Sequence, residues 1–153
     1  MGIGFWKGKI DLKISKHNYS PGETIKGTLH LKLKKPTKAR KVTIRLLGEE
    51  KVTRRRRDSQ GRSRSSTRTY RICDVLIPLD GEREYSEDTF EFEVPIPKEV
   101  LQGRPDGVAG DVIGALEFMG GTRRRIIWHL IGNLDIPMGF DLSKKQDIVV
   151  QEG

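Results

Sequence analysis

Arginine is the residue type in this chain that could do the most chemistry, and it is concentrated in one stretch. Residues 54–71 hold eight arginines, no lysine and one acid, Asp58, so they carry +7, while the 153-residue chain carries +8. The remaining 21 basic and 20 acidic residues nearly cancel. A planar guanidinium donates paired hydrogen bonds to carboxylate or phosphate oxygens. The stretch is therefore predicted to contact carboxylates, phosphates or an anionic surface.

A second cationic triplet lies far away in the sequence, at residues 123–125. The sequence leaves open whether this triplet adjoins the first stretch or lies at the other end of the fold. The candidate residues for binding an anionic partner are Arg54, Arg55, Arg56, Arg57, Arg62, Arg64, Arg68, Arg71, Arg123, Arg124 and Arg125.

Three interpretations of these arginines are open. They could form a solvated loop that keeps an exposed hairpin soluble and unpaired. They could bind an anionic protein partner, phosphorylated or not, and the absence of lysine in the stretch favours such a role over solubility alone. They could also bind nucleic acid through its backbone phosphates. Tyr70 is the one aromatic residue nearby, so a stacking platform for single strands is not expected.

Catalytic chemistry is not predicted. Cys73 is the only cysteine, lies in a strand-like segment, and has no evident base beside it in the sequence. His17, His30 and His129 are scattered without metal-ligand spacing. The chain contains no phosphate-binding loop, dinucleotide fingerprint or nucleophile elbow. We therefore expect a protein that is not an enzyme and that needs no cofactor and no metal.

Period-two alternation of apolar residues dominates the chain and predicts half-buried β-strands. The clearest segments are 10–14, 25–33, 42–46, 90–94 and 126–136. No convincing helix of ten or more residues is present. About seven or eight short strands separated by turn signals predict a single all-β domain over residues 1–153, an antiparallel sandwich.

Turn residues predict where the strands end. Residues 20–23 predict a turn, residues 35–38 predict a break between the second and third strands, and Asp80-Gly81 and Pro95–Pro97 predict further breaks. The arginine stretch is predicted to form a long hairpin with a loop at about 54–68 and a mobile tip. Trp128 is predicted to lie in the core, Phe5 and Trp6 are predicted to cover one end of the sandwich, and residues 98–107 have room for a helical turn.

The apolar runs and the cysteine content indicate the cellular location of the protein. No apolar run approaches the ~20 residues of a membrane-spanning helix. A single cysteine suits a reducing compartment, so a cytoplasmic location is expected.

Four motifs, taken in order, resemble those of a known superfamily. They are a Pro-Gly-Glu turn leading into a strand with a glycine, a strand ending in glycine, a phenylalanine-rich strand before a proline break, and a long late strand. In this chain they read Tyr19–Leu29, Lys41–Gly48, Thr89–Pro97 and Arg125–Pro137. This order resembles the N-terminal half of arrestin-like proteins. It is also similar to bacterial sporulation-control proteins and to the arrestin-like subunit of retromer.

The resemblance implies an immunoglobulin-like β-sandwich of the arrestin N-domain type and an adaptor, scaffold or regulatory role without catalysis. A full arrestin has two such sandwiches, and this chain has the length of one. The leading hypothesis is an interaction module that contacts an anionic or phosphorylated protein through the arginine hairpin. The alternative is a nucleic-acid-binding module that uses the same arginines. Exposed edge strands would also allow a homodimer.

Overall fold

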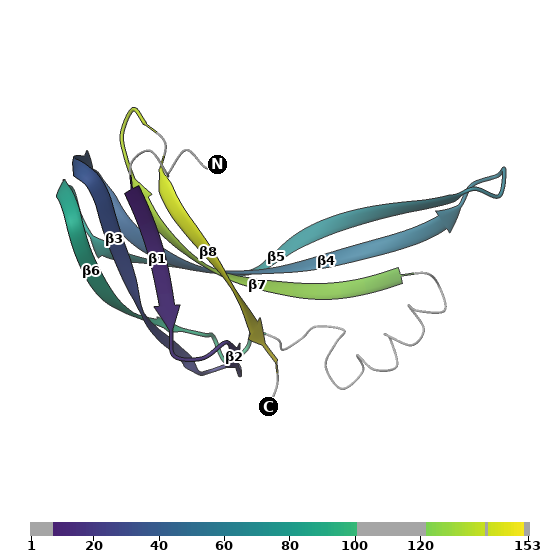
Figure 1. The fold of residues 1–153 in the computed structure, drawn as a ribbon. Helices are drawn as coiled ribbons and strands as arrows, with labels where there is room; N and C mark the ends of the chain where they lie inside the picture. Colours follow the sequence, from purple (N-terminus) through teal and green to yellow (C-terminus); the bar gives the residue numbers. More distant parts are fainter. Residues whose placement is uncertain (1–7, 101–121, 140, 152–153) are drawn as a thin grey trace.

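Eight strands build the described part of the chain, in line with the seven or eight that the alternation predicts. The computed structural model describes residues 8–100, 122–139 and 141–151 (Figure 1). The strands are β1 (Gly8–Ile14), β2 (Asn18–Tyr19), β3 (Thr24–Ala39), β4 (Lys41–Arg57), β5 (Ser63–Asp80), β6 (Arg83–Pro95), β7 (Thr122–Asp135) and β8 (Leu142–Val150). The predicted positions of Phe5 and Trp6, and most of the segment 98–107, lie outside the described residues.

Two sheets form an immunoglobulin-like sandwich of the arrestin N-domain type. One sheet has the strand order β1-β3-β6, and the other has the order β2-β8-β7-β4-β5. Neighbouring strands are antiparallel, except that β2 pairs with β8 in parallel. The predicted antiparallel sandwich is therefore confirmed.

The core lies between the two sheets because alternate residues of each strand face inward. Ile25, Leu29 and Leu31 of β3 are fully buried on one side. Val42, Ile44 and Leu46 of β4 and Leu130 and Leu134 of β7 are fully buried on the other. The indole of Trp128 is also buried, as predicted.

Gly48 allows this large indole to fit against β4. It continues the inward series of β4, and it pairs directly with Trp128 in the sheet. A Cβ added at Gly48 would lie 2.6 Å from the Trp128 ring, well inside van der Waals contact. The glycine that ends the strand motif in the sequence is thus required by close packing.

Turn predictions were right at three places and wrong at one, and the break predicted at Pro95–Pro97 is where β6 ends. The turn at residues 20–23 separates β2 from β3, with Gly22 at a φ of 90°, and Asp80-Gly81 separates β5 from β6. The predicted break at residues 35–38 is wrong, because β3 continues through Pro36 to Ala39. The pairing of β3 with β6 shifts register between Lys32 and Thr37, so Pro36 falls where the ladder is already interrupted.

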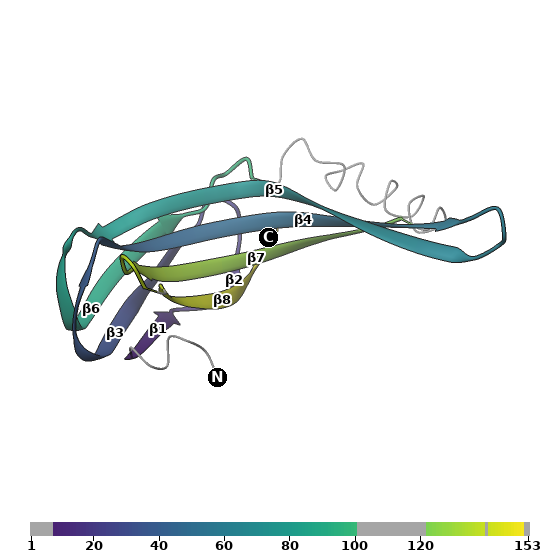
Figure 2. The same ribbon diagram turned by 90° about the horizontal axis from the view of Figure 1, so that it is seen from above.

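The long strands β4, β5 and β7 extend well beyond the three-stranded sheet, as Figures 1 and 2 show. We call this projection the arginine arm and define it as residues 49–71 with residues 122–127. The hairpin is longer and its loop shorter than the sequence predicted. Pairing continues to Arg57 and Ser63, so residues 54–57 and 63–68 lie in strands and only residues 58–62 connect them.

Candidate functional site: a cationic arm

The arginine arm unites the two cationic stretches that are far apart in the sequence. In the pairing of β4 with β7, Arg123 lies opposite Thr53, Arg124 opposite Val52, and Arg125 opposite Lys51. The sequence left open whether residues 123–125 adjoin the first arginine stretch or lie at the other end of the fold. In the structure the triplet lies beside the hairpin. All eleven candidate arginines lie on this one projection.

Strand alternation divides the arm into two faces. The first, which we call the hydroxyl face, carries Lys51, Thr53, Arg55, Arg57, Ser63, Ser65, Thr67, Thr69, Arg123 and Arg125. The second continues the inward-facing side of β4, and we call it the core-side face. It carries Val52, Arg54, Arg56, Arg64, Ser66, Arg68, Tyr70 and Arg124. Cationic side chains thus occupy both faces.

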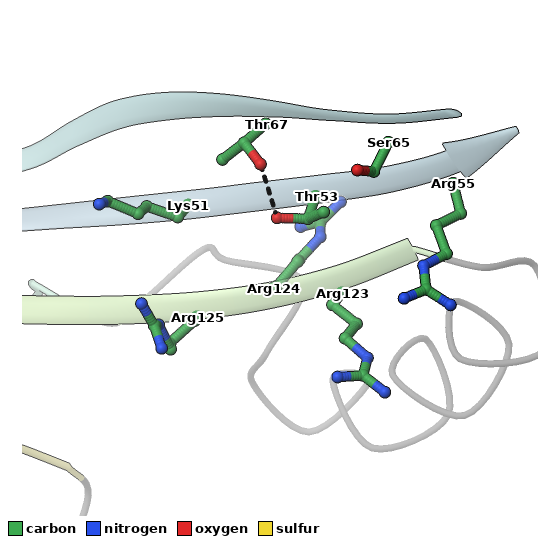
Figure 3. A pocket seen from close by; sticks show the side chains of 8 residues that line it. All are labelled: Lys51, Thr53, Arg55, Ser65, Thr67, Arg123, Arg124 and Arg125. Carbon is green, nitrogen blue, oxygen red and sulfur yellow. Dashed lines mark hydrogen bonds between the residues drawn. The ribbon is translucent and has the colours of Figure 1, made fainter. Parts of the chain in front are cut away.

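The hydroxyl face is hollowed along its middle (Figure 3). The hollow is lined by Lys51, Thr53, Arg55, Ser65, Thr67, Arg123 and Arg125 of this face, and Arg124, whose strand position belongs to the core-side face, also contributes to the lining. The Thr53 and Thr67 hydroxyls are hydrogen-bonded across the strands, with their oxygens 3.0 Å apart. Among the described residues, no carboxylate lines this hollow. A surface of hydroxyls, guanidinium groups and one ammonium group favours an anion.

Most of the candidate arginines have no acidic neighbour among the residues that the structure describes. Arg64 lies 3.7 Å from Asp58 and Arg71 lies 3.3 Å from Asp74, and Arg124 has interactions of its own. Within the described residues, no acidic group comes within 4.0 Å of the other eight, which are Arg54, Arg55, Arg56, Arg57, Arg62, Arg68, Arg123 and Arg125. All eight are exposed. Their donors are available to a partner without breaking an internal ion pair.

The single acid of residues 54–71 is used by the turn itself. The Asp58 carboxylate accepts hydrogen bonds from the backbone N–H of Gln60 at 2.9 Å and of Arg62 at 2.8 Å. The N–H of Gly61 bonds to the Asp58 carbonyl, and Gly61 has a φ of 80°. This is a tight turn followed by a glycine bulge, a common way to close a hairpin. Asp58 is therefore committed to the turn and neutralises little of the arm.

The described residues show no group of metal ligands, and their one thiol is not activated. Cys73 is a buried free thiol, and burial, together with the neighbouring Asp74, raises its pKa, so it is a poor nucleophile. No group of three or more histidine, cysteine, aspartate or glutamate side chains that could hold a metal occurs in this part of the chain. His30 contacts Thr89, and His129 contacts Asp147, each across paired strands.

The family is decided by comparison with known proteins. The model of the arrestin (or S-antigen) N-terminal domain matches residues 8–104, from β1 to beyond β6. The chain belongs to the arrestin N-terminal domain family. Families of this kind are in general regulatory or adaptor proteins and not enzymes. No curated protein sequence gives a significant match.

A solved structure extends the arrestin likeness over nearly the whole chain. The crystal structure of Spo0M, the sporulation control protein from Bacillus subtilis, matches with a TM-score of 0.61 and 19% identity. The match covers 96% of this chain and 50% of Spo0M, so the chain spans about half the length of that protein. At this identity the likeness concerns the fold. The resemblance stated from the four sequence motifs is confirmed.

Sequence reasoning assigned the arginines to the site but not the residues between them. Thr53, Ser65 and Thr67 line the hydroxyl-face hollow, and Lys51 extends it. Period-two alternation of serine or threonine with arginine between Ser63 and Thr69 was the signal that would have found them. It places the hydroxyls on one face of a strand and the arginines on the other.

In the part of the chain that is described, no helix is long and apolar enough to cross a membrane.

Proposed function

We propose that this protein is a non-enzymatic adaptor or regulatory module that binds an anionic segment of a partner protein through the arginine arm. Membership of an arrestin family supports the regulatory role. The free thiol Cys73 and the lack of other cysteines fit a reducing compartment, and we place the activity in the cytoplasm.

One observation carries this proposal: eight exposed arginines, without acidic neighbours in the described part of the chain, lie together on one projection. Like charges in close array repel one another. Binding of an anion relieves this repulsion and so lowers the free energy of the system. A loop needed only for solubility would be served equally well by lysine, whereas the arm strands carry arginine at ten positions and lysine at Lys51 alone. The fork of a guanidinium suits carboxylate and phosphate oxygens.

Nucleic acid is the second candidate, favoured by the presence of arginines on both faces at the two-stranded end of the arm. A two-stranded β-ribbon fits the major groove, where phosphates lie on both sides. Arg54 and Arg56 face one side, Arg55 and Arg57 face the other, and Arg62 lies at the tip. Tyr70 is the one aromatic side chain of the arm, so binding would depend on the phosphates.

A charge-matched pair of variants tests the proposal. In the arm variant, Arg54, Arg55, Arg56 and Arg57 are replaced by serine. In the control, serine replaces four exposed lysines of the body, Lys9, Lys13, Lys144 and Lys145, so that both proteins lose the same charge. Binding of a labelled glutamate-rich peptide and of labelled duplex DNA is measured by anisotropy from low salt to about 150 mM.

The expected result is that the peptide binds the wild type and the control and loses most of its affinity for the arm variant. DNA binding that survives at the upper salt concentration, follows a steep log–log slope and disappears in the arm variant would favour the second candidate. Equal binding of both ligands by the two variants would overturn the arm as the binding site.

A further inference from the structure

The outer edge of β5 in the arm is the feature that the proposed function does not yet use. β5 is the last strand of its sheet, and β4 is its hydrogen-bonding neighbour within the described chain. We propose that this edge, from Ser63 to Thr69, accepts an extended segment of the partner as an added strand, with acidic side chains at every second position. The proposal rests on the proposed function and specifies the shape and the sequence pattern of the partner.

The turn determines which backbone groups of β5 are free. The N–H of Asp58 bonds to the carbonyl of Arg62 at 2.9 Å, so these residues are a hydrogen-bonded pair. In an antiparallel ladder, hydrogen-bonded and non-hydrogen-bonded pairs alternate. With the register Arg57 opposite Ser63, the non-hydrogen-bonded residues of β5 are Ser63, Ser65, Thr67 and Thr69. Their N–H and C=O groups therefore point away from β4.

A side-chain contact supports this assignment. Opposed side chains lie closest in non-hydrogen-bonded pairs. Thr53 and Thr67 form one of the pairs assigned to that class, and their hydroxyl oxygens are 3.0 Å apart. The register also shows no shift anywhere between Glu49–Arg71 and Arg57–Ser63, so the alternation holds over the whole arm.

The side chains of this edge suit an approaching backbone. Every residue with outward backbone groups is a serine or threonine, so no long side chain on these residues crowds the edge. The intervening positions place Arg64 and Arg68 on the core-side face. Proline residues and β-bulges commonly block pairing at a sheet edge. In β5 these features are Pro78 and the register shifts, and they lie outside residues 63–69. The free edge therefore runs from Ser63 to Thr69, about three periods of the side-chain alternation.

Charge decides what occupies the edge. A second copy of β5 would bring Arg64 and Arg68 against arginines of its own kind, which opposes self-pairing. An acidic strand would place its carboxylates beside Arg64 and Arg68, and its other side chains beside the serine and threonine hydroxyls. This complementarity requires acids at alternate positions, because side chains on one face of a strand recur with period two.

The test uses a defined peptide, twelve residues of alternating glutamate and threonine, with a block peptide of six glutamates followed by six threonines as the control. Both have the same charge, so charge alone predicts equal affinity. Strand addition predicts that the alternating peptide binds about tenfold more tightly, since it satisfies several edge hydrogen bonds together. Equal affinity for the two peptides would overturn the proposal.

A matched pair of protein variants isolates the backbone of the edge. Ser65→Pro removes an outward N–H without removing a hydrogen bond to β4, and Ser65→Ala removes the hydroxyl and keeps the N–H. We expect the proline variant to lose the preference for the alternating peptide and the alanine variant to keep it. Retained slow amide exchange at Arg64 and Ser66, whose N–H groups face β4, verifies that the proline variant keeps the hairpin.

Modified peptides give a measurement that leaves the protein unchanged. N-methylation of every threonine blocks an antiparallel addition, and N-methylation of every glutamate blocks a parallel one. Binding must therefore fail for one set and survive for the other. If neither modification matters while replacement of Arg54–Arg57 by serine still abolishes binding, the added strand is wrong and the proposed function stands. If that arginine variant also binds normally, the proposed function fails as well.

Discussion

Individual residues of this fold have clear physical tasks, and Gly48 has one of the simplest. Its missing side chain leaves the space that the Trp128 ring fills, 2.6 Å from where a Cβ would lie. We expect Gly48→Ala to destabilise the protein by about 1–3 kcal/mol through overpacking of the core. Urea unfolding followed by tryptophan fluorescence measures the change. The matched control is Gly81→Ala, because a Cβ at Gly81 meets nothing within 4 Å.

Asp80 and Arg83 give stability a dependence on pH. The Arg83 Nε donates to Asp80 at 2.8 Å, and the N–H of Gly81 donates to the same carboxylate. These bonds hold the pKa of Asp80 below its ordinary value. The unfolded chain therefore binds a proton more readily than the native one. The stabilisation is complete above the ordinary aspartate pKa of about 4 and is lost as the pH falls through the lower native pKa.

The expected outcome is that Asp80→Asn has a lower melting temperature than the wild type at neutral pH. Because the variant lacks this titrating carboxylate, its melting temperature should fall less between neutral and acid pH. Melting curves of both proteins from about pH 6 to about pH 2 measure the difference. The side chain is about one-third exposed, so the effect is small. Parallel curves for the two proteins over the whole range would show that the ion pair does not contribute.

At the scale of elements, alternation carries most of the information in the sequence. It predicted the strands, the all-β class and the buried side of β4, because side-chain direction is a local property of an extended chain. It did not predict that β3 continues past Pro36, because that depends on a register shift in the pairing with β6. The position of Arg123 beside Thr53 likewise depends on the pairing of β4 with β7, across some seventy residues of sequence.

The end of the arm is predicted to be separable from the fold. Replacing residues 55–65 by Asn-Gly leaves Arg54 and Ser66 to flank the new turn. The alternation makes them a hydrogen-bonded pair, which suits a two-residue hairpin. All the removed residues lie outside the buried core. We expect a cooperative melt with stability changed by about 1 kcal/mol or less, and loss of peptide binding. A broad or absent transition would instead show that the arm supports the sandwich.

For the whole molecule, the mismatch between its two sheets creates the site. The sheet β1-β3-β6 covers one end of the five-stranded sheet, and β4, β5 and β7 continue past it as the arm (Figure 2). The body is close to electrically neutral, whereas residues 54–71 carry +7. The molecule is therefore strongly asymmetric in charge, with the positive end projecting away from the sandwich. This asymmetry favours encounter in which an acidic partner approaches the arm first.

Such steering predicts a specific kinetic behaviour. The association rate of an acidic peptide with the wild type should fall by about tenfold or more between low salt and about 150 mM, since the Debye length shortens to ~8 Å. The dissociation rate should change much less. Stopped-flow fluorescence measures both. The body-lysine control should keep this salt dependence although it has lost four positive charges, because those charges lie off the arm. If both variants lose it equally, net charge, and not its position on the arm, governs the encounter.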